Sequence, residues 1–227
     1  MEFPLKDYIK NISALLQTQK RSFYRHNSQY VEAGKLEKER QVAEDFEKSD
    51  AINNSENKLG VLLAQHPGVR NTAVDIGSGT GWYAKKLSQQ FGRVIAIEPS
   101  VAAINIAQQF YPEKQFPNIL WMEGFAENIL CKLHFQLPVL FFSGVVLSHL
   151  RDREVKQICQ AVTLCAPKGS LLSFSECWGM EYHQLMWHIR TKEWWQEQLP
   201  GWELNFHGPQ VQNIPGRHKG FHGVKVH

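Results

Sequence analysis

The feature that most constrains this chain is the segment VDIGSGTGWYAKKL, residues 74–87, in which three glycines occupy alternate positions directly after a short apolar run. Gly77, Gly79 and Gly81 lack a Cβ, so the main chain there can turn tightly and lie directly against a ligand. The dinucleotide fingerprint G-x-G-x-x-G does not fit, because Trp82 stands three residues after Gly79. The phosphate loop G-x-x-x-x-G-K-S/T does not fit either, because no lysine occupies the required place. The segment therefore predicts a loop whose main chain contacts a ligand, and this ligand is not expected to be bound through a pyrophosphate.

Short apolar runs alternate with helical patterns between residues 72 and 176. The expected strands are 72–76, 93–97, 118–122, 138–143 and 170–176, and the expected helices are 82–91, 101–110 and 153–165. Near-continuous apolar strands separated by helices are typical of a parallel sheet covered on both faces, whose ligands bind at the carboxyl ends of the strands. Two further strand-like runs, 202–208 and 220–226, have no helix between them and predict an antiparallel pair.

The expected fold class is α/β, a Rossmann-like doubly wound sheet of seven mostly parallel strands with an antiparallel C-terminal strand and helices on both faces. Residues 1–60 are polar with a helical pattern, and they predict a helical N-terminal extension or cap. Residues 61–227 are expected to form the domain that carries the glycine segment. Residues 177–218 are expected to insert a lid on the substrate side, because five of the seven tryptophans lie at 178, 187, 194, 195 and 202.

Composition narrows the classes of partner. The net charge of +3 and the pI near 8.6 are too weakly basic to argue by themselves for nucleic-acid or membrane binding. No apolar run approaches the length of about 18 residues that spans a bilayer, and the first residues lack the apolar core of an export signal. The four cysteines, at 131, 159, 165 and 177, show no C-x-x-C spacing. We therefore expect a cytoplasmic protein with reduced thiols, no metal, and neither a membrane nor a nucleic acid as partner.

The glycine segment resembles the first motif of the class I S-adenosylmethionine-dependent methyltransferases, and the resemblance, which points to their small-molecule branch, extends over about residues 60–176. It implies S-adenosylmethionine as the cofactor and S-adenosylhomocysteine as the product. It also implies that the methionine part of the cofactor lies beside the loop, at Asp75, Gly77, Ser78, Gly79 and Gly81. Glu98 ends the next expected strand, 17 residues after Gly81. In this family the acid at that place binds the ribose hydroxyls, which a carboxylate can do in a bidentate manner.

The motif near the adenine departs from the family pattern. In WMEGFAENI, residues Gly124, Ala126 and Glu127 match a Gly-Asp-Ala-Glu type sequence, but Phe125 replaces the acid. Phe125 is expected either to pack on the purine, with the amide of Ala126 serving the ring nitrogens, or to belong to the core. The predicted cofactor set is completed by Pro99 and Ser143.

His149, in FFSGVVLSHLRD after the fourth expected strand, is the predicted general base. An imidazole near half-titration at neutral pH suits proton removal from a hydroxyl; the alternative is a histidine that packs at the start of a helix. Family members that methylate nucleobase or glutamine amino groups carry Asn/Asp-Pro-Pro-Tyr after this strand. Here 142–145 are Phe-Ser-Gly-Val, which argues against that chemistry. Val145 and Ser148 replace the two metal-binding glutamates of a quinone-directed group.

The predicted acceptor contacts come from two segments, and they are Tyr24, Tyr30, Trp178, His183, Trp187 and Arg190. The two tyrosines are expected to close the pocket from the N-terminal segment. Aromatic walls with basic side chains suit a sugar ring or an aromatic acceptor; the alternative is that the tryptophans bury a helix against the sheet.

The sequence thus predicts methyl transfer to a small-molecule acceptor, with O-methylation of a hydroxyl on a sugar, glycoside or aromatic natural product as the leading reaction. A methyltransferase that acts on RNA or protein and a non-catalytic cofactor-binding partner subunit remain as alternatives. No feature of the sequence indicates the oligomeric state.

Overall fold

The computed structural model describes residues 59–144, 146–176, 182–184, 187–207 and 220–227. The expected N-terminal extension therefore lies almost wholly outside the described residues, as does much of the expected lid. Tyr24, Tyr30 and Trp178 are among the predicted acceptor contacts that fall there. Within the described part, no helix is both long enough and apolar enough to cross a membrane.

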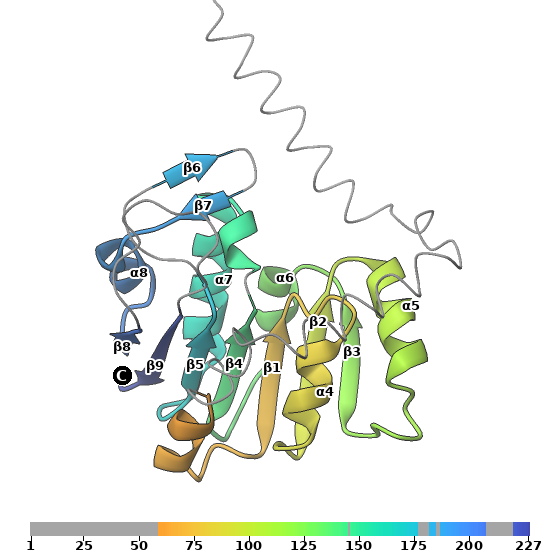
Figure 1. Ribbon diagram of the computed structural model, residues 1–227. Coiled ribbons are helices and arrows are strands. Elements are labelled where there is room, and N and C mark those ends of the chain that lie inside the picture. The colour runs from red at the N-terminus through yellow and green to blue at the C-terminus, as the bar shows by residue number, and fades with distance from the viewer. Residues whose placement is uncertain (1–58, 145, 177–181, 185–186, 208–219) are drawn as a thin grey trace, which may run out of the picture.

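A single seven-stranded sheet organises the domain in the order β3-β2-β1-β4-β5-β9-β8 (Figure 1). Its strands are β1 (Thr72–Ile76), β2 (Arg93–Glu98), β3 (Ile119–Glu123), β4 (Val139–Ser143), β5 (Leu171–Phe174), β8 (Trp202–Phe206) and β9 (Phe221–Lys225). Strands β1 to β5 pair in parallel, whereas β9 pairs antiparallel with both β5 and β8. The predicted fold class is confirmed, including the antiparallel pair at the C-terminal end.

Helices cover both faces of the sheet. They are α4 (Trp82–Ser88), α5 (Val101–Phe110), α6 (Ala126–Leu130), the 3-10 turn η2 (Leu147–His149), α7 (Asp152–Cys165) and α8 (Lys192–Gln198), and residues 59–65 are also helical. Because successive strand side chains point to opposite faces, Val74 and Ile76 pack with α6, α7 and α8, whereas Ala73 packs with α4 and the helix at 59–65. All five residues of β1 are buried, which agrees with a sheet covered on both sides.

The described part of the segment after β5, where a lid is expected, combines a hairpin with a helix. It contains a separate two-stranded antiparallel sheet, β6 (Tyr182–Gln184) and β7 (Trp187–Ile189), before α8 begins. Figure 1 shows this hairpin beside the N-terminal half of α7. Trp195 of α8 is fully buried and packs edge-on against Phe174 and tilted against Phe221. Trp195 therefore buries α8 against the sheet, as the alternative interpretation of the tryptophans predicted.

Candidate active site

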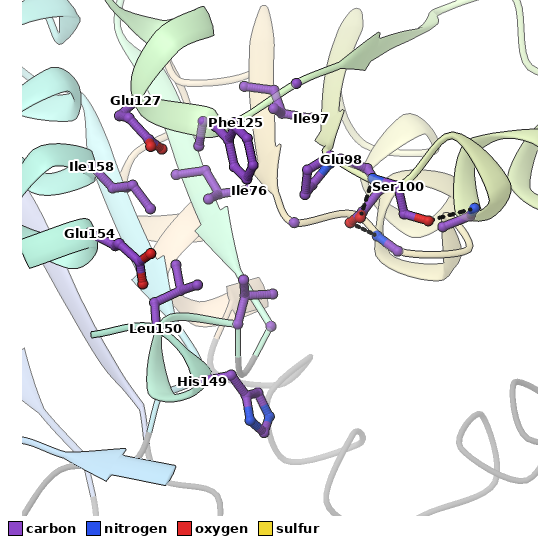
Figure 2. Close-up of a pocket in the computed structure, with 18 residues that line it drawn as sticks. Ile76, Ile97, Glu98, Ser100, Phe125, Glu127, His149, Leu150, Glu154 and Ile158 are labelled. Carbon is purple, nitrogen blue, oxygen red and sulfur yellow. Dashed lines mark hydrogen bonds between the residues drawn. The ribbon is translucent and has the colours of Figure 1, made fainter. Parts of the chain in front are cut away.

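A cavity of about 450 Å³ opens at the carboxyl ends of β1, β2 and β4. Seven of the predicted cofactor residues line it: Gly77, Gly79, Glu98, Pro99, Phe125, Ala126 and Glu127. His149 lines the same cavity. Figure 2 shows Glu98 and Ser100 on one side of it and Glu127, Glu154 and Ile158 on the other. The cavity is therefore bounded by the first βα turn, the turn after β2, the start of α6 and the segment from η2 into α7.

The three glycines of the loop have positive φ angles, but they serve different purposes. A Cβ at Gly77 would lie 2.6 Å from Cγ2 of Val146, and a Cβ at Gly81 would overlap the ring of Trp121. At these two positions a side chain is excluded because other protein atoms pack against the main chain. A Cβ at Gly79, where φ is +54°, would meet no atom of the part of the chain that the structure describes within 4 Å. Of the three, Gly79 is therefore the one whose bare main chain is open to a ligand in the cavity.

Glu98 fastens the glycine loop to the end of β2. It is 7% exposed, its Oε2 accepts a hydrogen bond from the amide of Gly79 at 3.0 Å, and its Oε1 accepts one from the amide of Ser100 at 2.9 Å. Burial raises the pKa of Glu98, while the hydrogen bonds from Ser100 and Gly79 oppose that rise. Since each carboxylate oxygen accepts more than one hydrogen bond, Glu98 can hold the loop and still receive two ligand hydroxyls.

Asp75, on β1, lies outside the cavity lining and is 1% exposed. Burial raises its pKa from 3.8 to about 8, with a further contribution from the charge of Glu98 and an opposing hydrogen bond from the backbone of Ala84. Its Oδ2 has no hydrogen-bond partner among the described residues. A buried carboxylate oxygen in this state fits a nearby positive charge, which the ammonium and sulfonium groups of S-adenosylmethionine would supply.

Ser78 and Ser143, both predicted to contact the cofactor, do not line the cavity. Ser78 is 8% exposed beneath the loop. The hydroxyl of Ser143 instead donates to Oε1 of Glu176 at 2.7 Å. Glu176, just after β5, is fully buried and also accepts hydrogen bonds from the amides of Leu147 and Ser148. Sequence reasoning missed Glu176, although it is an acid at a parallel strand end, the same signal that identified Glu98.

Arg190, predicted to contact the acceptor, is 1% exposed and bonds to protein atoms. Its guanidinium donates to Oδ1 of Asp152 at 2.9 Å and to the carbonyls of Leu147 at 2.9 Å and Leu150 at 2.6 Å. Burial lowers the pKa of Arg190, while the nearby carboxylate of Asp152 opposes that change. This placement supports a role in holding the protein together, because the donors of the side chain are turned away from solvent.

Two further predicted contacts lie on the hairpin that follows β5. His183 pairs with His188 across β6 and β7, and Trp187 pairs with Gln184. Within the described ranges, no group of three or more His, Cys, Asp and Glu side chains is arranged to hold a metal. The charged side chains in the described cavity lining are the carboxylates Glu98, Glu127 and Glu154, and that lining contains no Lys or Arg.

Residues 73–169 match the family model described as a methyltransferase domain. No curated protein sequence matches the chain. The fold is similar to that of DesVI from Streptomyces venezuelae, with a TM-score of 0.62, 10% identity, and coverage of 86% of this chain and 99% of that one. It is also similar to CalS10, an amino pentose methyltransferase from Micromonospora echinaspora solved with bound S-adenosylmethionine (TM-score 0.61, 11% identity, 82% and 96% covered). A third similar structure is magnesium protoporphyrin IX methyltransferase from Synechocystis PCC 6803 (TM-score 0.59, 15% identity, 92% and 96% covered).

Proposed function

We propose that this chain, whose residues 73–169 match a methyltransferase-domain model, is a class I S-adenosylmethionine-dependent methyltransferase that transfers a methyl group to a hydroxyl of a small molecule such as a sugar, a glycoside or an aromatic natural product. The observation that carries the proposal is the bond between Glu98 and the amide of Gly79. It joins a glycine whose open side faces the cavity to a buried carboxylate at the neighbouring strand end.

Different residues of the cavity contact different parts of the cofactor. The bound cofactor supplies a methyl group that is activated by its sulfonium. Glu98 accepts the ribose hydroxyls, and the backbone at Gly79 lies against the methionine part. Phe125 and Ile97 offer apolar surface to the base. Asp75, on β1, stabilises the positive charge of the cofactor. These contacts fix the orientation of the ligand and exclude water, and positioning of this kind supplies much of the acceleration in group transfer.

The acceptor is expected to be neutral or cationic. The carboxylates of Glu98, Glu127 and Glu154 in the described lining would repel an anionic acceptor such as a phosphosugar. A protonated amine would be attracted by the same carboxylates, and amine methylation is the second candidate reaction on that ground. CalS10, whose fold is similar, acts on an amino pentose, so amino sugars belong in the acceptor screen beside sugars and phenols.

Replacement of Glu98 by Gln tests the placement of the cofactor. Titration calorimetry with S-adenosylhomocysteine is expected to show binding to the natural protein and binding about 10- to 100-fold weaker to Glu98→Gln, because hydrogen bonds to an ionised acceptor contribute about 1.5–3 kcal/mol each. Glu203→Gln, which neutralises an exposed carboxylate on β8, is the matched control and should bind normally. Absence of binding by well-folded natural protein would refute the proposed function.

Replacement of His149 by Ala tests the proposed base. We expect turnover with a hydroxyl acceptor to fall by about 10²- to 10⁴-fold, the usual contribution of general acid–base catalysis, while the affinity for S-adenosylhomocysteine changes little. Steady-state kinetics with the acceptor found in the screen, together with calorimetry, gives both quantities. Unchanged turnover would show that His149 packs at the start of the helix and moves no proton.

A further inference from the structure

We infer that Glu176 and Arg190 are positioning residues, which hold the turn at 146–150 from opposite sides so that His149 and Leu150 face the cavity. This inference rests on the proposed function in one respect only, namely that the cavity binds the cofactor and the acceptor. The arrangement itself is carried by hydrogen bonds within the protein. Neither residue lines the cavity, whereas Val146, His149 and Leu150 do.

Glu176 holds the amide side of the turn. Its Oε1 accepts hydrogen bonds from the Ser143 hydroxyl at 2.7 Å and from the Leu147 amide at 3.0 Å, and its Oε2 accepts from the amide and the hydroxyl of Ser148, both at 2.8 Å. The carboxylate is fully buried, as are Leu147, Ser148 and Ser143. Four donors on one buried carboxylate satisfy its charge without a direct cation, and they fasten η2 to the ends of both β4 and β5.

Arg190 holds the carbonyl side of the same turn. Its guanidinium donates to the carbonyls of Leu147 and Leu150, which bracket His149, and to the carbonyl of His188 at 3.3 Å. The remaining contact, to Oδ1 of Asp152, reaches the first residue of α7. A guanidinium presents donors in a rigid planar fork, so one side chain can fix two carbonyls that are three residues apart.

The two charges complement each other without touching. The turn contributes its amides to the carboxylate and its carbonyls to the guanidinium, and Glu176 also lies close enough to raise the pKa of Arg190 by its charge. Because Arg190 follows β7 directly, the pair also fastens the β6–β7 hairpin to the segment that carries His149. The position of the proposed base is thus set by residues from three separate parts of the chain.

The test compares Glu176→Gln with Leu87→Ala. A glutamine keeps the shape but presents one oxygen and one donor, so one of the Leu147 and Ser148 amides loses its acceptor. Leu87, which is 2% exposed, belongs to the core on the other face of the sheet, and its truncation lowers stability without touching the turn. Thermal unfolding measures the stability that each variant loses, so that the two losses can be matched. If Leu87→Ala is too unstable, Leu87→Val replaces it.

Three readouts separate a positioning role from a general loss of stability. In Glu176→Gln, exchange of the amide that loses its acceptor, that of Leu147 or that of Ser148, is expected to accelerate by about 10-fold or more relative to core strands, since a buried donor has lost its partner. The His149 ring signal in nuclear magnetic resonance should move toward that of an unstructured histidine. Affinity for S-adenosylhomocysteine should fall by about 10-fold, because Val146 and Leu150 no longer hold their wall of the cavity.

None of these changes is expected in Leu87→Ala. Equal effects in the two variants, or an unchanged His149 signal in Glu176→Gln, would overturn the inference. If Glu176→Gln does not fold, Arg190→Lys replaces it. The lysine keeps the charge but cannot reach both carbonyls, so the Leu150 side of the turn is expected to loosen while the natural exchange pattern elsewhere remains. Should the natural protein bind no S-adenosylhomocysteine, the proposed function fails, and the exchange and His149 readouts still decide the inference.

Discussion

Replacement of Gly79 by Val is expected to weaken cofactor binding by at least about 10- to 100-fold while the domain remains folded. A Cβ at this position meets no atom of the described residues within 4 Å, and Gly79 lines the cavity, so the added methyl groups are expected to enter the cavity and not the core. Overlap of these groups with a ligand costs about 1–3 kcal/mol for each misfit, which corresponds to a loss of about 10- to 100-fold or more. Calorimetry with S-adenosylhomocysteine measures the binding, and circular dichroism with thermal unfolding measures the fold.

The controls for this prediction come from the other glycines. Gly169→Val places the same side chain at a similar positive φ of +83°, away from the cavity, where a Cβ lies 3.5 Å from Cγ of Pro138. It isolates the cost of the left-handed backbone, about 1–2 kcal/mol, and should bind the cofactor normally. Gly77→Ala should instead lower stability, because its Cβ would displace Val146. Normal binding by Gly79→Val would contradict the placement of the ligand against this loop.

Replacement of Asp75 by Asn is expected to stabilise the ligand-free protein by a margin that increases with pH. Burial raises the pKa of Asp75 from 3.8 to about 8, so folding favours the protonated carboxyl. Its contribution to stability is therefore complete below about pH 4 and is lost as the pH rises to about 8. At about 1.4 kcal/mol per pH unit, the natural protein loses on the order of 3 kcal/mol between pH 5 and pH 7, which asparagine does not.

The measurement is the melting temperature of both proteins at about pH 5, 6, 7 and 8, with and without S-adenosylhomocysteine. Without ligand, the difference should grow by several degrees over this range, given about 2–4 °C per kcal/mol for a domain of this size. With ligand, the order should reverse, because the ammonium group of S-adenosylhomocysteine favours the ionised carboxylate that the variant lacks. A difference that is constant across pH would show that the carboxyl of Asp75 does not titrate in this range.

The parallel strands and the two site elements next to them could be predicted from the sequence because both are local signals. The apolar run of β1 ends at Asp75 and turns at Gly77, and the apolar run of β2 ends at Glu98, so a short window contains the strand and the residues at its carboxyl end. Parallel pairing then brings those ends to one edge without further information. The predicted strands at 202–208 and 220–226 were recognisable for the same reason.

The remaining features depend on contacts between distant segments. The reason for glycine at Gly81 is the ring of Trp121, 40 residues later, and no local pattern could reveal that contact. A basic side chain in an aromatic segment predicts a ligand contact, but Arg190 donates to the carbonyls of Leu147 and Leu150, which lie 43 and 40 residues away in sequence. The β6–β7 hairpin was missed because each of its strands has three residues, which is too short for an alternating pattern to be recognised.

The order of the strands separates two tasks along the chain. The sheet half formed by β1, β2 and β3, together with α6, supplies the proposed cofactor contacts from one continuous stretch, residues 75–127. The β6–β7 hairpin and α8 join the fold beyond β5, toward the opposite edge, and are linked to the cavity through Arg190. Because the proposed cofactor site and the β6–β7 hairpin come from separate stretches of the chain, replacement of the hairpin segment is expected to leave the residues that surround the proposed cofactor in place.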